Sequence, residues 1–222
     1  MKKIRVWDLP VRLFHWTLVV LITISLITQK IGGNAMEWHF LSGYAVLTLI
    51  FFRIVWGLVG TRYARFSDFI PSPAVIMAYL KQGKGAVQRT SLGHNPLGSL
   101  AVFAMLGVIL LQAATGLFAN DDIASEGPLV KFISKELSDR ITWFHKDVTG
   151  WLIFILIGVH VAAIAFYYFG KKENLVKPMI TGDKEIDIDA PVADDSWKMR
   201  LVAVLVLAVC AVAVYGLINL KP

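Results

Sequence analysis

One apolar run, residues 141–169, constrains the fold of this chain more than any other feature, because it is long enough to cross a bilayer and carries two histidines, His145 and His160. The histidines are 15 positions apart. In an α-helix this spacing corresponds to roughly 22 Å along the axis and roughly 60° in azimuth. A hydrocarbon core is about 30 Å thick. The spacing therefore predicts one helix that presents an imidazole near each membrane surface, on the same side of a bundle.

The composition is that of an integral membrane protein. Of the 222 residues, 56% are hydrophobic, and the mean hydropathy is +0.63, which is too apolar for a soluble domain of this size. The net charge is +6, but the basic residues lie in loops between apolar runs, so membrane topology accounts for them and no nucleic-acid partner is expected. The single cysteine, Cys210, lies in an apolar run, which excludes a disulfide framework.

Five apolar runs are long enough to be membrane spans, namely residues 13–29, 38–60, 96–118, 141–169 and 199–220. No small-residue cleavage site follows the first run, so we expect a retained span rather than a signal peptide. Residues 61–95 carry five basic residues against one aspartate, which predicts a cytoplasmic loop and a cytoplasmic N-terminus. Asp8 is expected to cap the first helix, with Pro10 in its first turn.

The connecting segments contain two shorter apolar pieces. Residues 73–80 are interpreted either as a helix along the membrane surface or as a packed loop. Residues 128–137 are expected to form a short surface helix on the outer side. Residues 170–196 are polar and are expected to be a cytoplasmic loop before the last span.

The predicted topology sorts four intramembrane histidines into two pairs by depth. His15 and His160 lie toward the inner leaflet, and His39 and His145 lie near the outer surface. Ionisable side chains in hydrocarbon are costly and usually functional, and imidazole is a common axial ligand of haem iron. Each level offers two neutral imidazoles without thiolate or clustered carboxylate, which favours bis-histidine haem.

A bare metal site and a proton relay are the competing roles for these histidines. A zinc or copper site needs three or four clustered ligands, and the pairs are too far apart for that. A proton relay usually includes acidic residues within the membrane, and the spans contain almost none. Both roles are therefore less favoured than haem ligation.

Further candidate site residues lie near the two membrane depths at which the histidines are paired. Small residues that leave room for a flat macrocycle, or that simply pack helices, are Gly43, Gly150 and Gly158. Basic residues that pair with haem propionates, or only anchor helices in the headgroups, are Arg12 and Arg53 inside and Arg140 and Lys146 outside. His94, at the inner mouth of the third span, is interpreted as a quinone hydrogen-bond partner, a propionate partner or a helix-entry residue.

Several motifs resemble a known family. They are WDLPVRLFHW, EWHFLSGY, LGHNPLG, TGLF, FHKDVTGW and GVHVAAIAFYY, and they are similar to those of the bacterial cytochrome b561 family, which is grouped with the b-type cytochrome subunits of nickel–iron hydrogenases. The resemblance covers roughly residues 4–180. It implies an all-α, integral membrane, four-helix bundle that holds two haem b groups, with His15, His39, His145 and His160 as axial ligands to the iron.

The resemblance also implies a domain organisation and a function. Residues 1–180 are the expected transmembrane cytochrome b domain. Residues 181–222, which lie outside the pattern of the family's shortest members, are expected to form a cytoplasmic loop and an additional transmembrane helix. Members of the family pass electrons between a redox partner on the outer side and membrane quinone. The expected location is the bacterial inner membrane, with the lipid bilayer and quinone as partners.

Three functions follow from these observations. The first is electron transfer in a respiratory chain, as a subunit or partner of a larger oxidoreductase, with a periplasmic c-type cytochrome, dehydrogenase or hydrogenase subunit as partner. The second is a stand-alone quinone oxidoreductase, such as a superoxide oxidase whose outer basic residues steer the anion. The third is a proton or metal-ion transporter. Bound haem would separate the third from the first two, and turnover by the purified chain alone would separate the second from the first.

Overall fold

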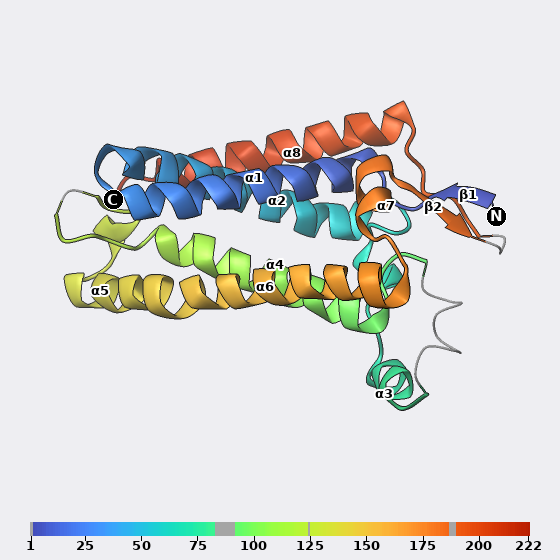
Figure 1. Cartoon of the computed structure of the whole chain (residues 1–222). Helices are drawn as coiled ribbons and strands as arrows, with labels where there is room; N and C mark the ends of the chain where they lie inside the picture. Colours follow the sequence, from blue (N-terminus) through green and yellow to red (C-terminus); the bar gives the residue numbers. More distant parts are fainter. Residues whose placement is uncertain (1, 83–91, 124, 187–189) are drawn as a thin grey trace. The chain divides into compact units, whose positions relative to one another are not determined.

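The fold is described from a computed structural model that covers residues 2–82, 92–123, 125–186 and 190–222. In this part of the chain, five helices are long and apolar enough to cross a membrane, and they span Leu9–Ile31, Gly33–Val59, Pro96–Gly116, Lys135–Gly170 and Trp197–Ile218 (Figure 1). The predicted all-α membrane fold with a fifth, C-terminal span is confirmed. The chain is a multi-pass membrane protein.

The first two spans are joined by a tight glycine turn. Helix α1 (Leu9–Ile31) is followed by the 3-10 turn η1 (Gly33–Ala35) and by α2 (Met36–Val59). Gly32 and Gly33 have φ angles of 68° and 53°, in the left-handed region that glycine adopts without a steric penalty. The two glycines therefore let the chain reverse its direction between the first two spans.

Helix α4 (Pro96–Gly116), the third span, begins as its sequence predicts. Pro96 occupies the first turn, where its missing N–H needs no partner. The Asn95 side chain accepts a hydrogen bond from the Gly98 N–H at 2.7 Å. The loop before this span contains the 3-10 turn η2 (Phe66–Asp68) and α3 (Pro73–Gln82), so the apolar piece at 73–80 is helical.

The fourth span is longer and less regular than predicted. It begins at α5 (Lys135–Trp143), where the Ser134 side chain caps the helix, and continues as a π-helical turn η4 (Phe144–Thr149), α6 (Gly150–Ala165) and a second π-helical turn η5 (Phe166–Gly170). The surface helix expected at 128–137 is replaced by the 3-10 turn η3 (Val130–Phe132) and the start of α5. Because π turns advance less per residue than α turns, the azimuth calculated for a uniform α-helix does not apply.

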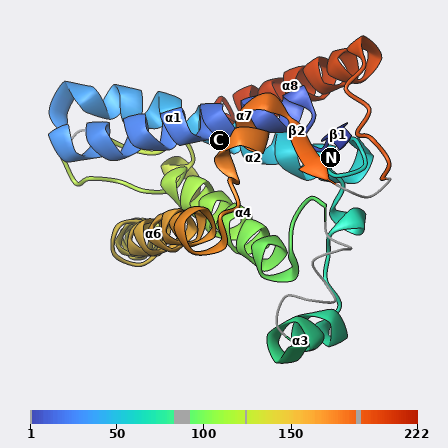
Figure 2. The ribbon, with the colours of Figure 1, turned by 45° about the vertical axis from the view of Figure 1, so that its right-hand side comes forward.

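A small sheet was not predicted. Strands β1 (Lys2–Arg5) and β2 (Asp183–Ile186) pair antiparallel, with Lys3 opposite Glu185 and Arg5 opposite Asp183. Helix α7 (Val176–Thr181) directly precedes β2 and lies beside the sheet (Figures 1 and 2). Part of the segment expected to be a polar loop, residues 176–186, is thus folded into a helix and a strand that pairs with residues 2–5.

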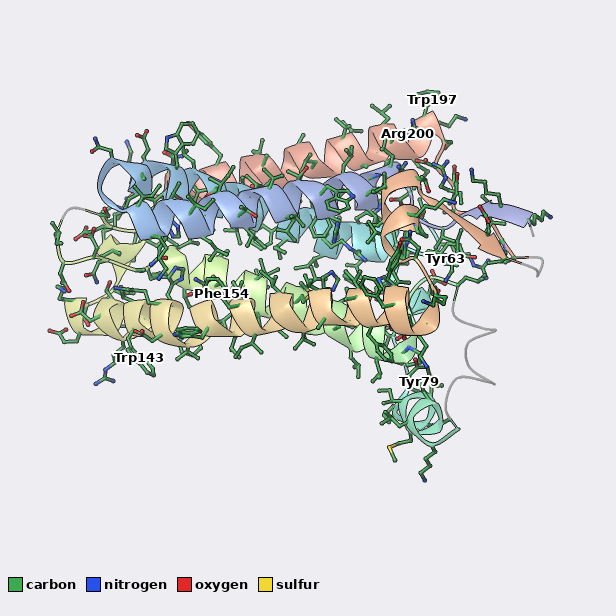
Figure 3. The ribbon with its side chains drawn as sticks, viewed as in Figure 1. Tyr63, Tyr79, Trp143, Phe154, Trp197 and Arg200 are labelled. Atoms are coloured by element: carbon green, nitrogen blue, oxygen red, sulfur yellow. The ribbon has the colours of Figure 1, made fainter. Side chains whose placement is uncertain are left out.

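One aspartate connects this sheet to the last span. Asp195 accepts hydrogen bonds from Arg5 at 2.5 Å, from the Leu9 N–H at 3.1 Å and from Arg200 at 3.1 Å. Arg200 lies in the first turn of α8 (Trp197–Ile218), close to Trp197 (Figure 3). Trp197 and Trp143 are 70% and 60% exposed. Exposed tryptophans at the ends of spans are typical of the membrane interface.

Residue contacts divide the chain into two compact units. The first comprises Met1–Leu13, Arg53–Met105 and Val159–Val204, and the second comprises Phe14–Phe52, Leu106–Gly158 and Leu205–Pro222. In the second unit the core includes Leu47, Leu117, Leu129 and Val214. These side chains come from α2, the turn after α4, the segment before η3 and α8, so the core joins three of the spans.

The core of the first unit is built around a buried carboxylate. Asp8 is 1% exposed and accepts hydrogen bonds from the Val11 N–H at 2.7 Å, the Trp56 indole at 3.0 Å and the Thr61 hydroxyl at 2.6 Å. It therefore caps α1, as predicted, and also binds the end of α2 and the following turn. A buried carboxylate is tolerated because its oxygens are satisfied in this way.

We expect the substitution Asp8→Ala to lower the free energy of unfolding by about 2–4 kcal/mol, because three buried donors would lose their acceptor. Thermal unfolding of the detergent-solubilised protein, followed by circular dichroism, measures this effect. The matched control is Asp68→Ala, which removes only an exposed ion pair with Arg65 and should cost less than ~1 kcal/mol. Equal midpoints for the two variants would contradict the proposed role of Asp8.

The strand pairing can be tested by cross-linking. In a Cys210→Ser background, we expect Lys3→Cys and Glu185→Cys to form a disulfide on mild oxidation, because opposed strand residues lie within about 5.5 Å of each other. After oxidation, a protease cuts the chain between the two positions. The measurement is whether the two fragments migrate together in electrophoresis without reductant. The combination Lys3→Cys with Lys184→Cys places the thiols on opposite faces of the sheet, and equal cross-linking of both pairs would argue against the register.

Candidate haem site

The second unit brings together two of the predicted ligands. The rings of His39, in the first turns of α2, and His145, in the π-helical turn η4, have centres 6.4 Å apart and planes at 90°. Both side chains are partly buried. Two histidines that are far apart in the sequence thus face each other within one unit.

Each of these histidines is held by a helix carbonyl. His39 Nδ1 lies 2.9 Å from the Ser25 carbonyl oxygen, and His145 Nδ1 lies 3.0 Å from the Gln112 carbonyl oxygen. A carbonyl can only accept, so both contacts favour the tautomer that carries the proton on Nδ1. The Nε2 atoms are therefore left with their lone pairs, which is the tautomer that a metal-ligating histidine requires.

The two anchoring carbonyls share a local pattern. A threonine hydroxyl three residues later lies near the same oxygen, with Thr28 at 3.3 Å from the Ser25 carbonyl and Thr115 at 3.0 Å from the Gln112 carbonyl. The shorter contact of each hydroxyl is with the preceding carbonyl, of Ile24 at 2.7 Å and of Leu111 at 2.8 Å. A hydroxyl at this spacing reaches back along its own helix. The two histidines are therefore oriented by equivalent supports on α1 and α4.

The ring separation fits two imidazoles on opposite sides of one iron. A bond from a metal to an imidazole nitrogen is about 2 Å long, so the two ring centres would lie roughly 6 Å apart, close to the observed 6.4 Å. Two neutral imidazoles are a ligand set of haem iron. No group of three or more His, Cys, Asp or Glu that could hold a metal ion occurs within the described ranges.

Gln112 and Thr149 complete the surroundings of His145. The Thr149 hydroxyl, fully buried, donates to the Gln112 side-chain carbonyl, and the Gln112 amide nitrogen lies 3.1 Å from His145 Nε2. An amide donor at this position is consistent with a lone pair on Nε2. Sequence reasoning missed Gln112, although an amide in the middle of an apolar span is a signal that could have found it.

The glycines near these histidines differ in their surroundings. A Cβ atom at Gly116 would lie 3.0 Å from His145 Cε1, so any side chain there would require the imidazole to shift. The predicted small residues Gly43 and Gly158 have open space where a Cβ would stand, and Gly150 faces the His145 carbonyl at 3.3 Å. Their role beside a macrocycle stays a prediction.

The remaining predicted ligands lie in different units. His15, on α1, is in the second unit and contacts the edge of Trp16, with ring centres 4.9 Å apart. His160, on α6, is in the first unit and is partly buried. The pairing of His15 with His160 stays a prediction.

Two basic candidates for the inner side lie in the first unit, Arg53 buried and Arg12 partly buried. Arg53 is 3% exposed, its guanidinium lies 4.8 Å from the centre of the Phe66 ring, and its Nη1 atom has no hydrogen-bond partner among the described residues. Arg12 donates to the Ile180 carbonyl at 2.7 Å, while its Nε atom is buried and likewise unpartnered. The outer candidates Arg140 and Lys146 are exposed.

His94 is also in the first unit, between two aromatic rings. Its ring centre lies 4.7 Å from that of Trp7 and 4.6 Å from that of Phe69. Burial, together with the nearby charge of Arg53, lowers the pKa of His94 to about 3. His94 is therefore neutral at physiological pH.

Five apolar spans and a facing pair of imidazoles, each with Nδ1 against a helix carbonyl, define a helical membrane protein of the haem-cytochrome class. The chain belongs to the prokaryotic cytochrome b561 family, whose model matches residues 6–182. The family resemblance is thereby confirmed. The protein is a membrane cytochrome of electron transport, and its family implies haem b as the cofactor.

Curated relatives carry related descriptions. The chain is 24% identical over 221 residues to a probable Ni/Fe-hydrogenase B-type cytochrome subunit of Azotobacter chroococcum mcd 1, covering 84% of this chain and 90% of the relative. It is 25% identical over 221 residues to the protein of the same description from Azotobacter vinelandii, with the same coverage. A probable Ni/Fe-hydrogenase 1 B-type cytochrome subunit of Escherichia coli (strain K12) is 25% identical over 137 residues, 50% of this chain and 57% of the relative. No solved structure matches the chain.

The close approach of Gly116 to His145 leads to a prediction. We expect Gly116→Val to displace the His145 ring and remove at least half of the bound haem, because a side chain there would overlap the imidazole. The haem-to-protein ratio of the purified variant measures this. Gly107→Val is the matched control on the same helix, since its Cβ would meet nothing within 4 Å. Equal haem content in the two variants would show that His145 does not bind haem in this orientation.

Proposed function

We propose that this protein carries electrons across the bacterial inner membrane through two haem b groups, between a periplasmic redox partner and the quinone pool. The observation that best supports the proposal is the His39–His145 pair, with a ring separation of 6.4 Å and both Nδ1 atoms anchored to carbonyls. His15 and His160 are the proposed ligands of the second haem.

The protein's own groups would prepare each site for its cofactor. When bound, haem supplies one-electron redox chemistry at its iron. His39 and His145 provide the axial nitrogens, and the Ser25 and Gln112 carbonyls hold the imidazoles in the required tautomer. Because these groups are already oriented, little conformational freedom remains to be lost on binding. The apolar spans keep bulk water away from the ligands.

The remaining predicted site residues have supporting roles in this proposal. Arg12 and Arg53 would pair with propionates on the inner side, since each has a buried nitrogen without a hydrogen-bond partner in the described part of the chain. Such donors are costly unless an acceptor meets them. Arg140 and Lys146 would act near the outer surface. The glycines that would flank the macrocycle are Gly43, Gly150 and Gly158.

The proposed topology follows the distribution of charge. The basic loop 61–95 and the N-terminus would be cytoplasmic. Residues 1–180 would form the haem-binding domain, and residues 181–222 would add the loop and the fifth span. We assign the fifth helix to contact with a partner subunit.

The relatives favour a hydrogenase as that partner, because their descriptions name the B-type cytochrome subunit of a Ni/Fe-hydrogenase. A periplasmic c-type cytochrome or another dehydrogenase would serve the same chemistry. The alternative of superoxide oxidation receives less support, because Lys135, one of the outer cations expected to steer the anion, is paired with Asp122 and Asp139. Those carboxylates neutralise its attraction for an anion.

We expect His145→Ala and His160→Ala each to remove one haem of two, because each variant deletes one axial ligand of a different site. The reduced-minus-oxidised spectrum and the haem count per chain measure the loss. Phe154→Ala is the matched control on the same helix, where the side chain is 48% exposed (Figure 3), and it should keep both haems. Two haems bound in either histidine variant would disprove the assignment of that ligand.

A further inference from the structure

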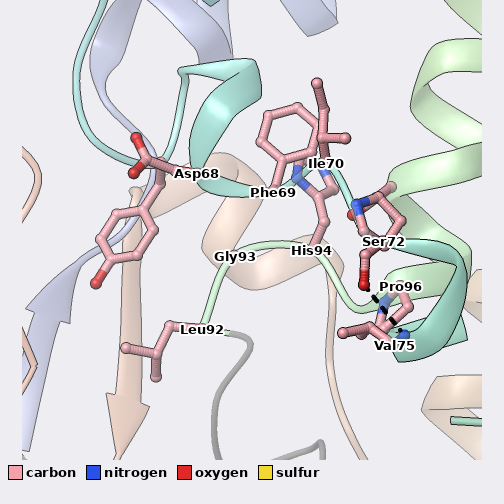
Figure 4. A pocket seen from close by; sticks show the side chains of 12 residues that line it. Asp68, Phe69, Ile70, Ser72, Val75, Leu92, Gly93, His94 and Pro96 are labelled. Carbon is pink, nitrogen blue, oxygen red and sulfur yellow. Dashed lines mark hydrogen bonds between the residues drawn. The ribbon is translucent and has the colours of Figure 1, made fainter. Parts of the chain in front are cut away.

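Helix α3 begins beside the entry to the third span. Ser72 caps the helix, since its hydroxyl oxygen accepts a hydrogen bond from the Val75 N–H at 3.3 Å (Figure 4). Ser72 and Val75 line the same pocket as Pro96, the first residue of α4. The first turn of α3 is therefore fixed next to the point where a span enters the bilayer.

The last turn of α3 is held by the fourth span. The Tyr79 hydroxyl lies 3.3 Å from the Tyr167 hydroxyl, which accepts a hydrogen bond from the Asn95 side-chain amide at 2.7 Å. Tyr167 lies in the π-helical turn η5 that ends the fourth span, and Asn95 directly precedes α4. These contacts keep α3 at the level where one span ends and another begins, which is the level of the lipid headgroups.

Helix α3 runs across these spans rather than along them. In Figure 1 it is seen end-on, whereas the beginning of α4 and the end of the fourth span, which belong to the same unit, are seen from the side. A helix that crosses the spans in this way lies parallel to the membrane surface. Its 10 residues are also too few to cross a hydrocarbon core.

The apolar side chains of α3 are largely exposed, with Met77 at 51% and Leu80 at 60%. At about 100° per residue, Ile76 and Leu80 lie on one face of the helix, and Ala74 and Lys81 lie on another, roughly 100–160° away. An exposed apolar face next to a basic one is typical of helices that lie in the membrane interface. The position at the span ends brings bilayer lipid to this apolar face without any other protein.

Exposed cations accompany α3 at this end of the spans. They belong to the first unit, and no ion pair joins them to a carboxylate within the described ranges. Anionic lipid headgroups attract such side chains near the membrane surface. The cations are Arg62, Lys81, Lys171 and Lys198.

We propose that α3 is an interfacial helix that binds anionic phospholipid, with Ile76 and Leu80 against the acyl chains and Lys81 among the phosphates. Tyr79 keeps a third side of the helix on the fourth span. The proposal is independent of the haem and quinone chemistry of the proposed function. Only the assignment of this leaflet as cytoplasmic comes from the proposed topology.

The test is the rate at which a water-soluble maleimide alkylates single cysteines in the full chain, with Cys210→Ser, in nanodiscs of phosphatidylcholine and phosphatidylglycerol. A thiol among acyl chains stays protonated and unreactive, so Leu80→Cys should react at least ~10-fold more slowly than Ala74→Cys, the matched control on the basic face. In phosphatidylcholine alone this ratio should fall at least ~threefold. Adding Lys81→Gln in the mixed lipid should lower it by a similar factor, because one attraction to the phosphates is lost.

Haem content is measured in every sample to verify folding, and Ile76→Cys serves as a second probe of the apolar face if Leu80→Cys loses haem. Equal rates on the two faces of α3 would show that the helix lies in water and would overturn the proposal. Protection that does not depend on phosphatidylglycerol or on Lys81 would overturn the role of anionic lipid. Protection in native membranes but not in nanodiscs would show that a protein covers this face, which also contradicts the proposal.

Discussion

A neutral imidazole inside an apolar span depends on having both of its nitrogens engaged, and the candidate haem site is organised around this requirement. For His39 and His145 the protein engages Nδ1 with a helix carbonyl, and the Gln112 amide approaches Nε2 of His145, the atom that would bind a metal. The carbonyls come from α1 and α4, so the two histidines on α2 and the fourth span are each fixed by a neighbouring helix. The same contacts in this unit therefore orient the candidate ligands and hold the neighbouring helices together.

The sequence predicts the spans well because their signal is local. Apolar runs of sufficient length mark all five helices, and Asp8, Asn95 and the two glycines at 32 and 33 mark boundaries that the structure confirms. The facing of His39 and His145 follows from depth alone, since the two spans place them at one level. The sequence does not predict the features that depend on long-range contacts. The π-helical turn at His145, the role of Gln112 and the β1–β2 sheet depend on neighbours that no local pattern identifies.

The first unit shows a different principle, in which carboxylates join segments that are distant in sequence. Asp8 connects the beginning of α1 to the end of α2, and Asp195 connects β1 to the start of α8. Each accepts several hydrogen bonds, so neither adds an isolated buried charge. His94, held between Trp7 and Phe69, lies within this framework, which explains why a loop residue can have a fixed orientation.

The pairing of β1 with β2 has a consequence for biosynthesis. Residues 2–5 leave the ribosome well before their partner strand, 183–186, which follows only after four spans have been made. During most of translation, residues 2–5 therefore have no partner strand. The positive charges of Lys2, Lys3 and Arg5 oppose pairing of this segment with other nascent chains during that time. The β1–β2 sheet can therefore form only after residues 183–186 have been synthesised.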